Sequence, residues 1–208
     1  MKKQLLIYCS LLVSLMVSAQ TSGGQITRGK KVVHSQNVSS SLKQVDWEIV
    51  KQTDKELITD DLSKSLSFLN TLPSTTSYIE EKPEVQGLLQ NKLYNINANE
   101  LLQYRRVRSI QVKSYGIFSY DYFNCKFSMR NGTIFFQKTT GSQRKSGYIY
   151  KKDNQSAVFL GGWSVNDEPQ TKYGSENSVI GTLYKIAPNK IIMLFGEEKS
   201  FEVYEFAR

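Results

Sequence analysis

The stretch FNCKFSMRNGTIFFQK, residues 123–138, decides the expected fold. Apolar residues alternate with polar ones before Asn131-Gly132 and resume after it, which is typical of two half-buried β-strands. Asn-Gly between two such runs is the strongest short signal for a two-residue hairpin, because both residues accept the positive φ of a type I′ turn. The sequence therefore predicts an antiparallel hairpin at this point.

The same period of two continues on both sides of this hairpin. We expect eight strands, at residues 104–113, 122–130, 133–138, 147–151, 156–163, 178–186, 190–195 and 200–206. Short connections make neighbouring strands antiparallel, so the strands should form a meander. Eight such strands curl into an up-and-down barrel or a strongly curved meander sheet, as in lipocalins and calycins.

The residues before the strands predict helices, which makes the fold class α+β with N-terminal helices packed on the β part. A stripe at spacings of four, four and three favours one long helix, and it consists of Ile58, Leu62, Leu66 and Leu69. We expect Asp54 to cap this helix and Pro73 to end it. A second helix should begin at Pro83. Asn97, with Glu100 three residues later, resembles a capping box for a last turn.

The first residues predict export. Lys2 and Lys3 precede an apolar run, and the small residues before Gln20 form a cleavage site after Ala19, so residues 1–19 read as a signal peptide. We expect residues 20–44 to be a flexible leader and 45–208 to be a single domain, mainly helical over 45–103 and antiparallel β over 104–208. The protein should be periplasmic or secreted. No later run approaches about 18 apolar residues, so no integral membrane segment is expected after cleavage.

Composition narrows the possible functions. The formal net charge is +8, and Lys2 and Lys3 are the only charged residues of 1–19, so +6 remains after cleavage. The basic residues are scattered and no nucleic-acid motif occurs, so no nucleic-acid partner is expected. The remaining cysteine, Cys125, lies at an apolar position of a strand, and the only histidine is His34 in the leader. Ser-His-Asp, Cys-His and histidine-rich metal sites are unsupported, and we expect a monomeric non-enzyme without metal or cofactor.

Two polar stretches are the candidates for function. TTGSQRKSGYIY (139–150) begins with a polar loop, and SVNDEPQTKYGSEN (164–177) is long for a hairpin connection. Since the ends of a meander alternate, loops 139–147 and 164–177 should share one rim. Arg144 is a planar fork suited to carboxylate or phosphate, or it closes the rim by an ion pair with Asp167 or Glu168. The candidate ligand-binding residues are Ser142, Gln143, Arg144, Ser146, Trp163 and Tyr173.

The segments FNCKFSMRNGTIFFQKTTGSQRKSGYIY, FLGGWSVNDEPQTKYG and FEVYEFAR resemble an uncharacterised family of exported bacterial proteins, domain of unknown function 4893. The resemblance rests on a Thr-Gly-Ser-Gln-Arg-x-Ser-Gly core and covers about residues 104–208. It implies a fold unit and no activity. It also implies a second cysteine in the first strand, where this chain has Val107, so Cys125 is expected to be a free thiol.

Three function classes remain open. The main expectation is an exported, non-enzymatic protein that binds an unknown small molecule or envelope component. Ser146-Gly147-x-x-Tyr150 also resembles the loop of exported inhibitors of c-type lysozyme, although Leu160 stands where those inhibitors have a lysine. The third class is a carboxylate-dependent hydrolase that uses the acids of loop 164–177. A projecting Ser146 would favour the inhibitor, and two facing carboxyl groups would favour the hydrolase.

Overall fold

A computed structural model describes residues 41–208 of the chain. The predicted signal peptide, most of the predicted leader and His34 lie outside the described residues. The last residues of the leader are attached to the β part, because Lys151 N donates to Lys43 O at 2.7 Å and Val45 N donates to Lys151 O at 3.0 Å.

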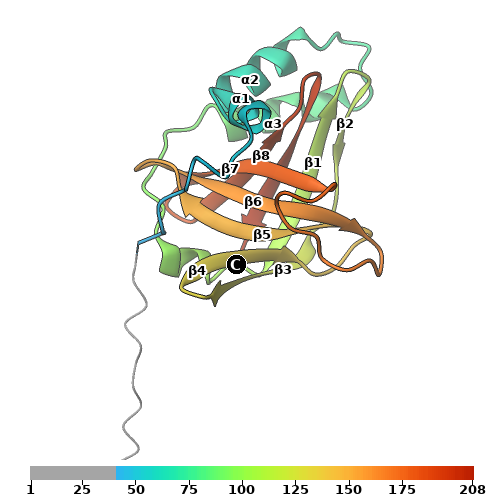
Figure 1. The fold of residues 1–208 in the computed structure, drawn as a ribbon. Helices are drawn as coiled ribbons and strands as arrows, with labels where there is room; N and C mark the ends of the chain where they lie inside the picture. Colours follow the sequence, from blue (N-terminus) through green and yellow to red (C-terminus); the bar gives the residue numbers. More distant parts are fainter. Residues whose placement is uncertain (1–40) are drawn as a thin grey trace, which may run out of the picture. The chain divides into compact units, whose positions relative to one another are not determined.

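The β part is a closed antiparallel barrel of eight strands, as predicted (Figure 1). Its last strand pairs with its first in unbroken register, from Arg106–Ala207 to Lys113–Ser200. This pairing leaves no open edge between the two strands. The ring consists of β1 (Arg106–Lys113), β3 (Phe123–Arg130), β4 (Thr133–Lys138), β5 (Gln143–Lys151), β6 (Ser156–Val165), β7 (Ser178–Ala187), β8 (Lys190–Gly196) and β9 (Ser200–Ala207).

A ninth strand, β2 (Gly116–Ser119), was not predicted. It pairs with the second half of β1, from Lys113–Gly116 to Ile110–Ser119. Strand β1 consequently meets β3 through only two residue pairs, Arg106–Asn124 and Val107–Phe123. Four residues are too few to show a convincing alternation, which is why the pattern missed this strand.

Strand β5 begins at Gln143, four residues earlier than predicted. The predicted rim loop 139–147 was therefore wrong in extent, and only residues 139–142 connect β4 to β5. Residues 143–146 are all polar, and they range from the exposed Gln143 to the buried Ser146. Gly141 has φ +88, the left-handed conformation that the tight turn requires.

The helices precede the barrel strands in the chain and pack on the barrel, as predicted, but the predicted long first helix is divided into two. α1 (Gln52–Leu57) and α2 (Asp61–Thr71) are separated at Asp60, whose φ of 52° interrupts the helical path. Asp54 lies inside α1 and does not cap it. The remaining helical elements are η1 (Ile79–Glu81), α3 (Lys82–Leu89) and α4 (Ala98–Leu101). At the start of α4, Asn97 Oδ1 accepts a hydrogen bond from Asn99 N at 2.8 Å, so Asn97 caps this helix as predicted. The Glu100 carboxylate accepts from Lys185 and Arg208 instead of completing the predicted capping box.

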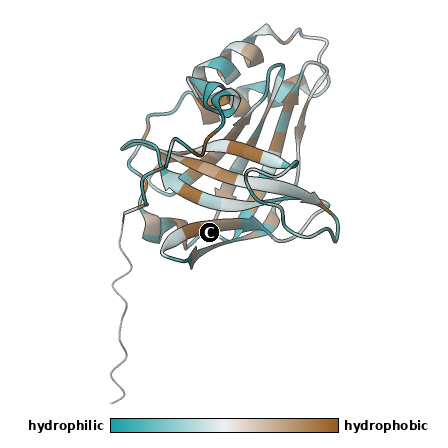
Figure 2. Cartoon of the chain, in the orientation of Figure 1, coloured by the Kyte–Doolittle hydropathy of each residue, from teal (hydrophilic) through white to brown (hydrophobic). Residues whose placement is uncertain are grey.

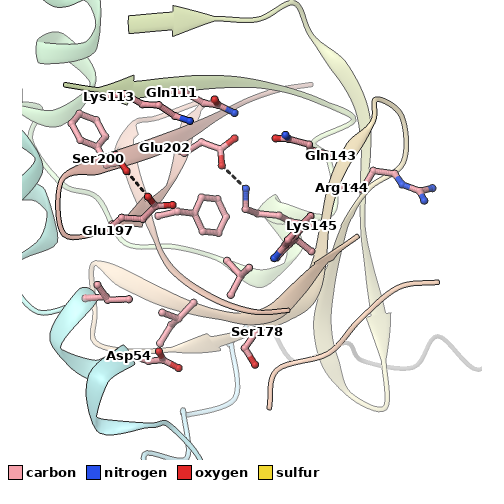
Figure 3. Close-up of a pocket in the computed structure, with 17 residues that line it drawn as sticks. Asp54, Gln111, Lys113, Gln143, Arg144, Lys145, Ser178, Glu197, Ser200 and Glu202 are labelled. Atoms are coloured by element: carbon pink, nitrogen blue, oxygen red, sulfur yellow. Dashed lines mark hydrogen bonds and ion pairs between the residues drawn. The ribbon is translucent and has the colours of Figure 1, made fainter. Parts of the chain in front are cut away.

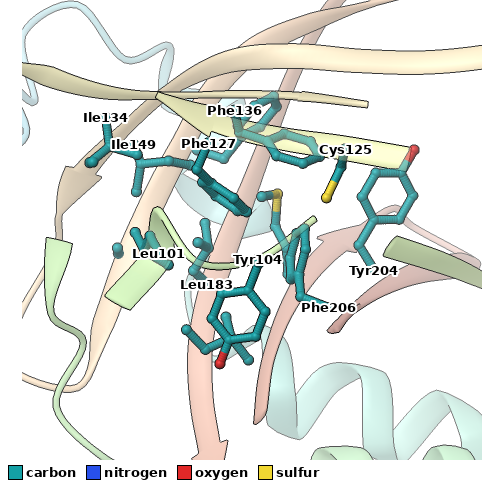
Figure 4. Packing of buried hydrophobic residues seen from close by; sticks show 14 of the residues in the cluster. Leu101, Tyr104, Cys125, Phe127, Ile134, Phe136, Ile149, Leu183, Tyr204 and Phe206 are labelled. Atoms are coloured by element: carbon teal, nitrogen blue, oxygen red, sulfur yellow. The ribbon is translucent and has the colours of Figure 1, made fainter. Parts of the chain in front are cut away.

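Aromatic side chains fill the interior of the barrel (Figure 4). The Phe127 ring centroid lies 5.0 Å from that of Phe136 and 5.2 Å from that of Phe206. Cys125 belongs to the same cluster, and burial raises the pKa of its thiol to about 12. The predicted core cysteine is therefore confirmed.

Two further apolar clusters lie between the barrel wall and the N-terminal elements. α2 and α3 cover the residues of β1, β8 and β9 that point away from the interior, including Ile110, Ile192 and Val203. Segment 45–58 covers Val158 and Leu160 of β6, and Trp47 packs against this cluster. Over part of the wall, the side chains on both faces of the strands are therefore apolar. These apolar stretches are coloured brown along the strands in Figure 2.

Candidate binding site at the barrel mouth

One end of the barrel, which we call the mouth, is bordered by loops 139–142, 166–177 and 197–199. The predicted common rim is confirmed, because Asn166 N donates to Ser142 O at 2.8 Å and so joins the first two loops. Glu197 of the β8–β9 turn also borders the opening, as do Asp54 and Leu57 of α1.

A cavity of about 410 Å³ lies in the mouth (Figure 3). One part of its wall is polar, with Gln111, Lys113, Gln143, Lys145, Glu197 and Glu202. The other part is apolar, with Leu57, Trp163, Val179, Ile180, Phe195 and Phe201. The aromatic cluster lies beneath, so the cavity occupies the mouth and does not extend along the barrel axis.

An ion pair between Lys145 Nζ and Glu202 Oε2 crosses the cavity floor. Ser109 Oγ donates to the other oxygen of this carboxylate. Burial raises the pKa of Glu202. The charge and hydrogen bond of Lys145 and the hydrogen bond of Ser109 together lower it by more, so the pKa lies below its ordinary value. Lys145 Nζ also lies 4.7 Å from the Phe195 ring centroid and 4.9 Å from that of Tyr204. Glu202 is thus held as a carboxylate against an aromatic floor.

A second lysine, Lys138, is buried beside this pair. Its ammonium donates to Gln143 O at 2.9 Å and lies 4.1 Å from the Phe123 ring centroid. Burial lowers its pKa to about 8; the negative charge of Glu202 opposes this shift, and the positive charge of Lys145 adds a smaller lowering. Lys138 and Lys145 therefore both lie close to the Glu202 carboxylate at the floor of the mouth.

The structure divides the six predicted site residues between two faces. Gln143 and Trp163 line the mouth cavity, and Ser142 lines a smaller adjoining pocket. Arg144 borders the cavity, but its guanidinium points away from the other mouth residues in Figure 3. Ser146 follows two residues later on the same outward side of β5 and is buried.

Arg144 forms no ion pair with any described residue, so the predicted pairing with Asp167 or Glu168 was wrong. Its NH2 atom donates instead to the backbone oxygen of Glu168 at 3.2 Å. The Glu168 carboxylate accepts from Val165 N at 2.8 Å within its own loop.

Tyr173 attaches the long loop to the first helix. Its hydroxyl donates to Asp54 Oδ2 and accepts from Lys51 N at 3.1 Å. Burial and the Asp54 carboxylate raise its pKa to about 12. Tyr173 therefore positions the loop rather than lining the cavity.

The residues that sequence reasoning missed are Lys138, Lys145 and Glu202. Two of them lie two residues from an inward aromatic side chain: Lys138 follows Phe136, and Glu202 precedes Tyr204. Continuing the alternation to the strand ends would have found Lys138 and Glu202, because a residue keeps its face even where its chemistry changes.

The described fold is an α+β barrel with a cavity at one mouth, and comparison with known families agrees with the sequence resemblance. The family described as a domain of unknown function (DUF4893) matches residues 48–206, and the chain belongs to it. No curated protein and no solved structure matches the chain.

Within residues 41–208, none of the helices has both the length and the apolar character needed to span a bilayer. In the same part of the chain, no group of three or more His, Cys, Asp and Glu residues is arranged to hold a metal ion.

Proposed function

We propose that this protein is an exported binding protein that holds a small amphiphilic molecule in the barrel mouth. The observation that carries the proposal is the cavity of about 410 Å³ with the Lys145–Glu202 pair at its floor. Ligand pockets of proteins commonly measure about 300–1,000 Å³ and occur in the mouths of β-barrels. The filled interior restricts the ligand to the mouth.

The cavity walls favour a ligand with two different ends. Lys145 and Glu202 offer a donor and an acceptor together, and Gln111 and Gln143 add amide groups beside them. A neutral or zwitterionic polar group matches this arrangement better than a single net charge, because the pair is already balanced. The apolar part of the ligand would lie against Trp163 and the neighbouring apolar wall.

The contacts of the long loop and of β5 support binding over the two alternatives. Ser146 is only 4% exposed, whereas a lysozyme-inhibitor-like mode needs it on a projecting loop. A hydrolase needs a pair of free carboxyl groups, whereas the Glu168 carboxylate accepts a hydrogen bond from Val165 N and the Glu202 carboxylate is paired with Lys145. Export is proposed from the signal-peptide features of residues 1–19.

Native mass spectrometry of the protein released by osmotic shock from a bacterial host tests the proposal. The expected mass is that of residues 20–208 plus a non-covalent adduct that is lost on denaturation. The double variant Lys145→Gln/Glu202→Gln should lose the adduct, because it removes both charges while keeping side chains of similar size.

A matched control exists at another site on the barrel. Lys185 and Glu100 form an ion pair whose side chains are 15% and 13% exposed, close to the 13% and 16% of Lys145 and Glu202. Lys185→Gln/Glu100→Gln should keep the adduct. A wild-type protein without adduct, or equal adducts in both double variants, would contradict binding in the mouth. An uncleaved mass would contradict export.

A further inference from the structure

Another pocket, lined only by residues with polar or charged side chains, lies on the outer face of the barrel wall near the mouth. It measures about 230 Å³, and residues of β4, β5 and β6 line it together with Gln170 of the long loop. Two cross-strand pairs define the wall, Gln137 with Ser146 and Arg144 with Ser164. No aspartate or glutamate lines the pocket, so Arg144 gives it a positive charge.

Three hydrogen-bond donors at this pocket are unused. Arg144 Nε is buried and has no hydrogen-bond partner among the described residues. Ser146 and Ser164 are 4% and 3% exposed, and no described residue hydrogen-bonds to either hydroxyl group. A buried donor without a partner costs about 1–3 kcal/mol, so Arg144 Nε needs an explanation, and the two unpaired hydroxyl groups lining the same pocket are available to the same ligand.

The long loop fixes the geometry of the pocket. Arg144 NH2 donates to Glu168 O at 3.2 Å, which orients the guanidinium and leaves Nε for another partner. Gln170 Nε2 donates to Gln137 Oε1 at 3.3 Å, which ties the loop to β4. The Glu168 carboxylate is engaged with Val165 N. The donors are thus pre-positioned on strands and held by a loop, as binding sites require.

We propose that this pocket binds a tetrahedral oxyanion, phosphate or sulfate, through Arg144, Ser146 and Ser164. A guanidinium and two hydroxyl groups supply charge-assisted and neutral hydrogen bonds to such an anion, and the lining brings no competing carboxylate. The anion is either free in solution or the head group of a phospholipid. The inference is independent of the mouth ligand, because Arg144 points away from the mouth residues.

Binding of inorganic phosphate and sulfate tests the site, by calorimetry and thermal unfolding in Tris chloride of matched ionic strength. We expect saturable binding and a rise in unfolding temperature beyond that given by chloride. Arg144→Gln should weaken phosphate binding by about tenfold or more, since it removes the charge-assisted bond. Arg106→Gln, which changes an arginine that does not line the pocket, should bind phosphate like the wild type.

The double variant Ser146→Ala/Ser164→Ala keeps the test decisive if Arg144→Gln fails to fold. It removes two unpaired hydroxyl groups, so it should fold and bind phosphate several-fold more weakly. Sedimentation with phosphatidylglycerol vesicles, with phosphatidylcholine vesicles as the control, distinguishes the two sources. Vesicle binding that phosphate displaces identifies a head group, and phosphate binding without vesicle binding identifies the free anion. No saturable effect of any probe, or equal binding by the pocket variants and wild type, would overturn the proposal.

Discussion

Lys145 on β5 and Glu202 on β9 form an ion pair across the barrel mouth, although 57 residues separate them in the chain. The two strands are not neighbours in the sheet, so the pair joins opposite walls. An ion pair of this kind depends on both partners, because either one alone is a poorly solvated charge.

The first prediction concerns this pair. Glu202→Gln should lower the free energy of unfolding at pH 7 by about 3 kcal/mol, because Lys145 then lacks its counter-ion. Adding Lys145→Gln should restore part of this loss. Because the pKa of Glu202 lies below its ordinary value, its stabilisation is present above the unfolded pKa and disappears as the pH falls through the folded pKa. Urea denaturation of the four members of this mutant cycle between pH 3 and pH 7 measures both effects, and additive losses would contradict the coupling.

Lys138 should destabilise the fold at neutral pH. Its folded pKa of about 8 lies below the ordinary 10.5, so the folded state disfavours the ammonium form. Stability from this group therefore rises as the pH increases from about 8 to 10.5. Lys138→Met should gain roughly 1–2 kcal/mol at pH 7, since each pKa unit corresponds to about 1.4 kcal/mol and the lost bond to Gln143 O offsets part of the gain. Denaturation of wild type and variant at pH 7 and pH 9.5 checks this, and a constant difference would contradict it.

The contribution of Asp61 to stability should change with pH in the opposite direction to that of Glu202. It is 2% exposed, its Oδ1 accepts from the Tyr184 hydroxyl, and its Oδ2 has no partner among the described residues. Burial raises the pKa of Asp61 despite the hydrogen bond from Tyr184. The folded state therefore favours the protonated acid, and stability from this group falls as the pH rises from its unfolded pKa through its folded pKa.

Asp61→Asn isolates that effect, because asparagine keeps an oxygen acceptor for Tyr184 without the charge. Relative to wild type, the variant should be more stable at pH 7 than at pH 4. Denaturation midpoints at the two pH values measure the change. A variant whose disadvantage grows with pH would show that Asp61 is ionised and stabilised by its surroundings.

Two glycines permit the close approach of β5 and β6. A Cβ at Gly147 would lie 2.4 Å from Gly161 Cα, and a Cβ at Gly161 would lie 2.2 Å from Ser146 O. Gly147→Ala should therefore cost about 3 kcal/mol or more, because backbone atoms have to move. Gly87→Ala in α3 is the control, since nothing lies within 4 Å of its Cβ position, and it should stabilise by about 0.5–1 kcal/mol. Thermal unfolding of both variants measures this, and equal stability changes would refute the steric explanation.

Tyr173 should control the mobility of the long loop. Tyr173→Phe keeps the ring but removes the hydrogen bonds to Asp54 and Lys51, so amide exchange in residues 166–176 should accelerate. Tyr150→Phe is the matched control: this ring packs in the same cluster, and its hydroxyl makes no hydrogen bond with a described residue. Hydrogen exchange followed by mass spectrometry checks both, and unchanged exchange in Tyr173→Phe would show that the loop is held by other contacts.

The alternation of apolar residues was sufficient to predict the barrel, because a period of two depends only on which face of a strand is buried. The alternation did not predict the strand residues that lack a clear pattern of one buried apolar face. β5 extends through polar residues at the mouth, and β2 is too short to display a period. The long helix was overpredicted because its apolar stripe continues through Asp60, where the backbone turns instead.

The candidate site was predicted only in location. The common rim of the two loops followed from meander geometry, but the side of the wall that each residue faces depends on where β5 begins. Starting that strand at residue 147 placed Ser142 to Ser146 in one loop, whereas in the structure Gln143 and Lys145 face the mouth and Arg144 and Ser146 face outward. The Lys145–Glu202 contact required the barrel radius and stagger, which no local pattern contains.

The pairing of β9 with β1 also determines the order in which the molecule can assemble. During synthesis β1 is made before the other strands. The edge of β1 that pairs with β9 stays exposed until residues 200–207 have been made. Contacts so distant along the chain form slowly, because a long loop must close before they stabilise anything. A chain that stops before Ser200 would expose the edges of both β1 and β8, and its expected fate is aggregation rather than a smaller stable barrel.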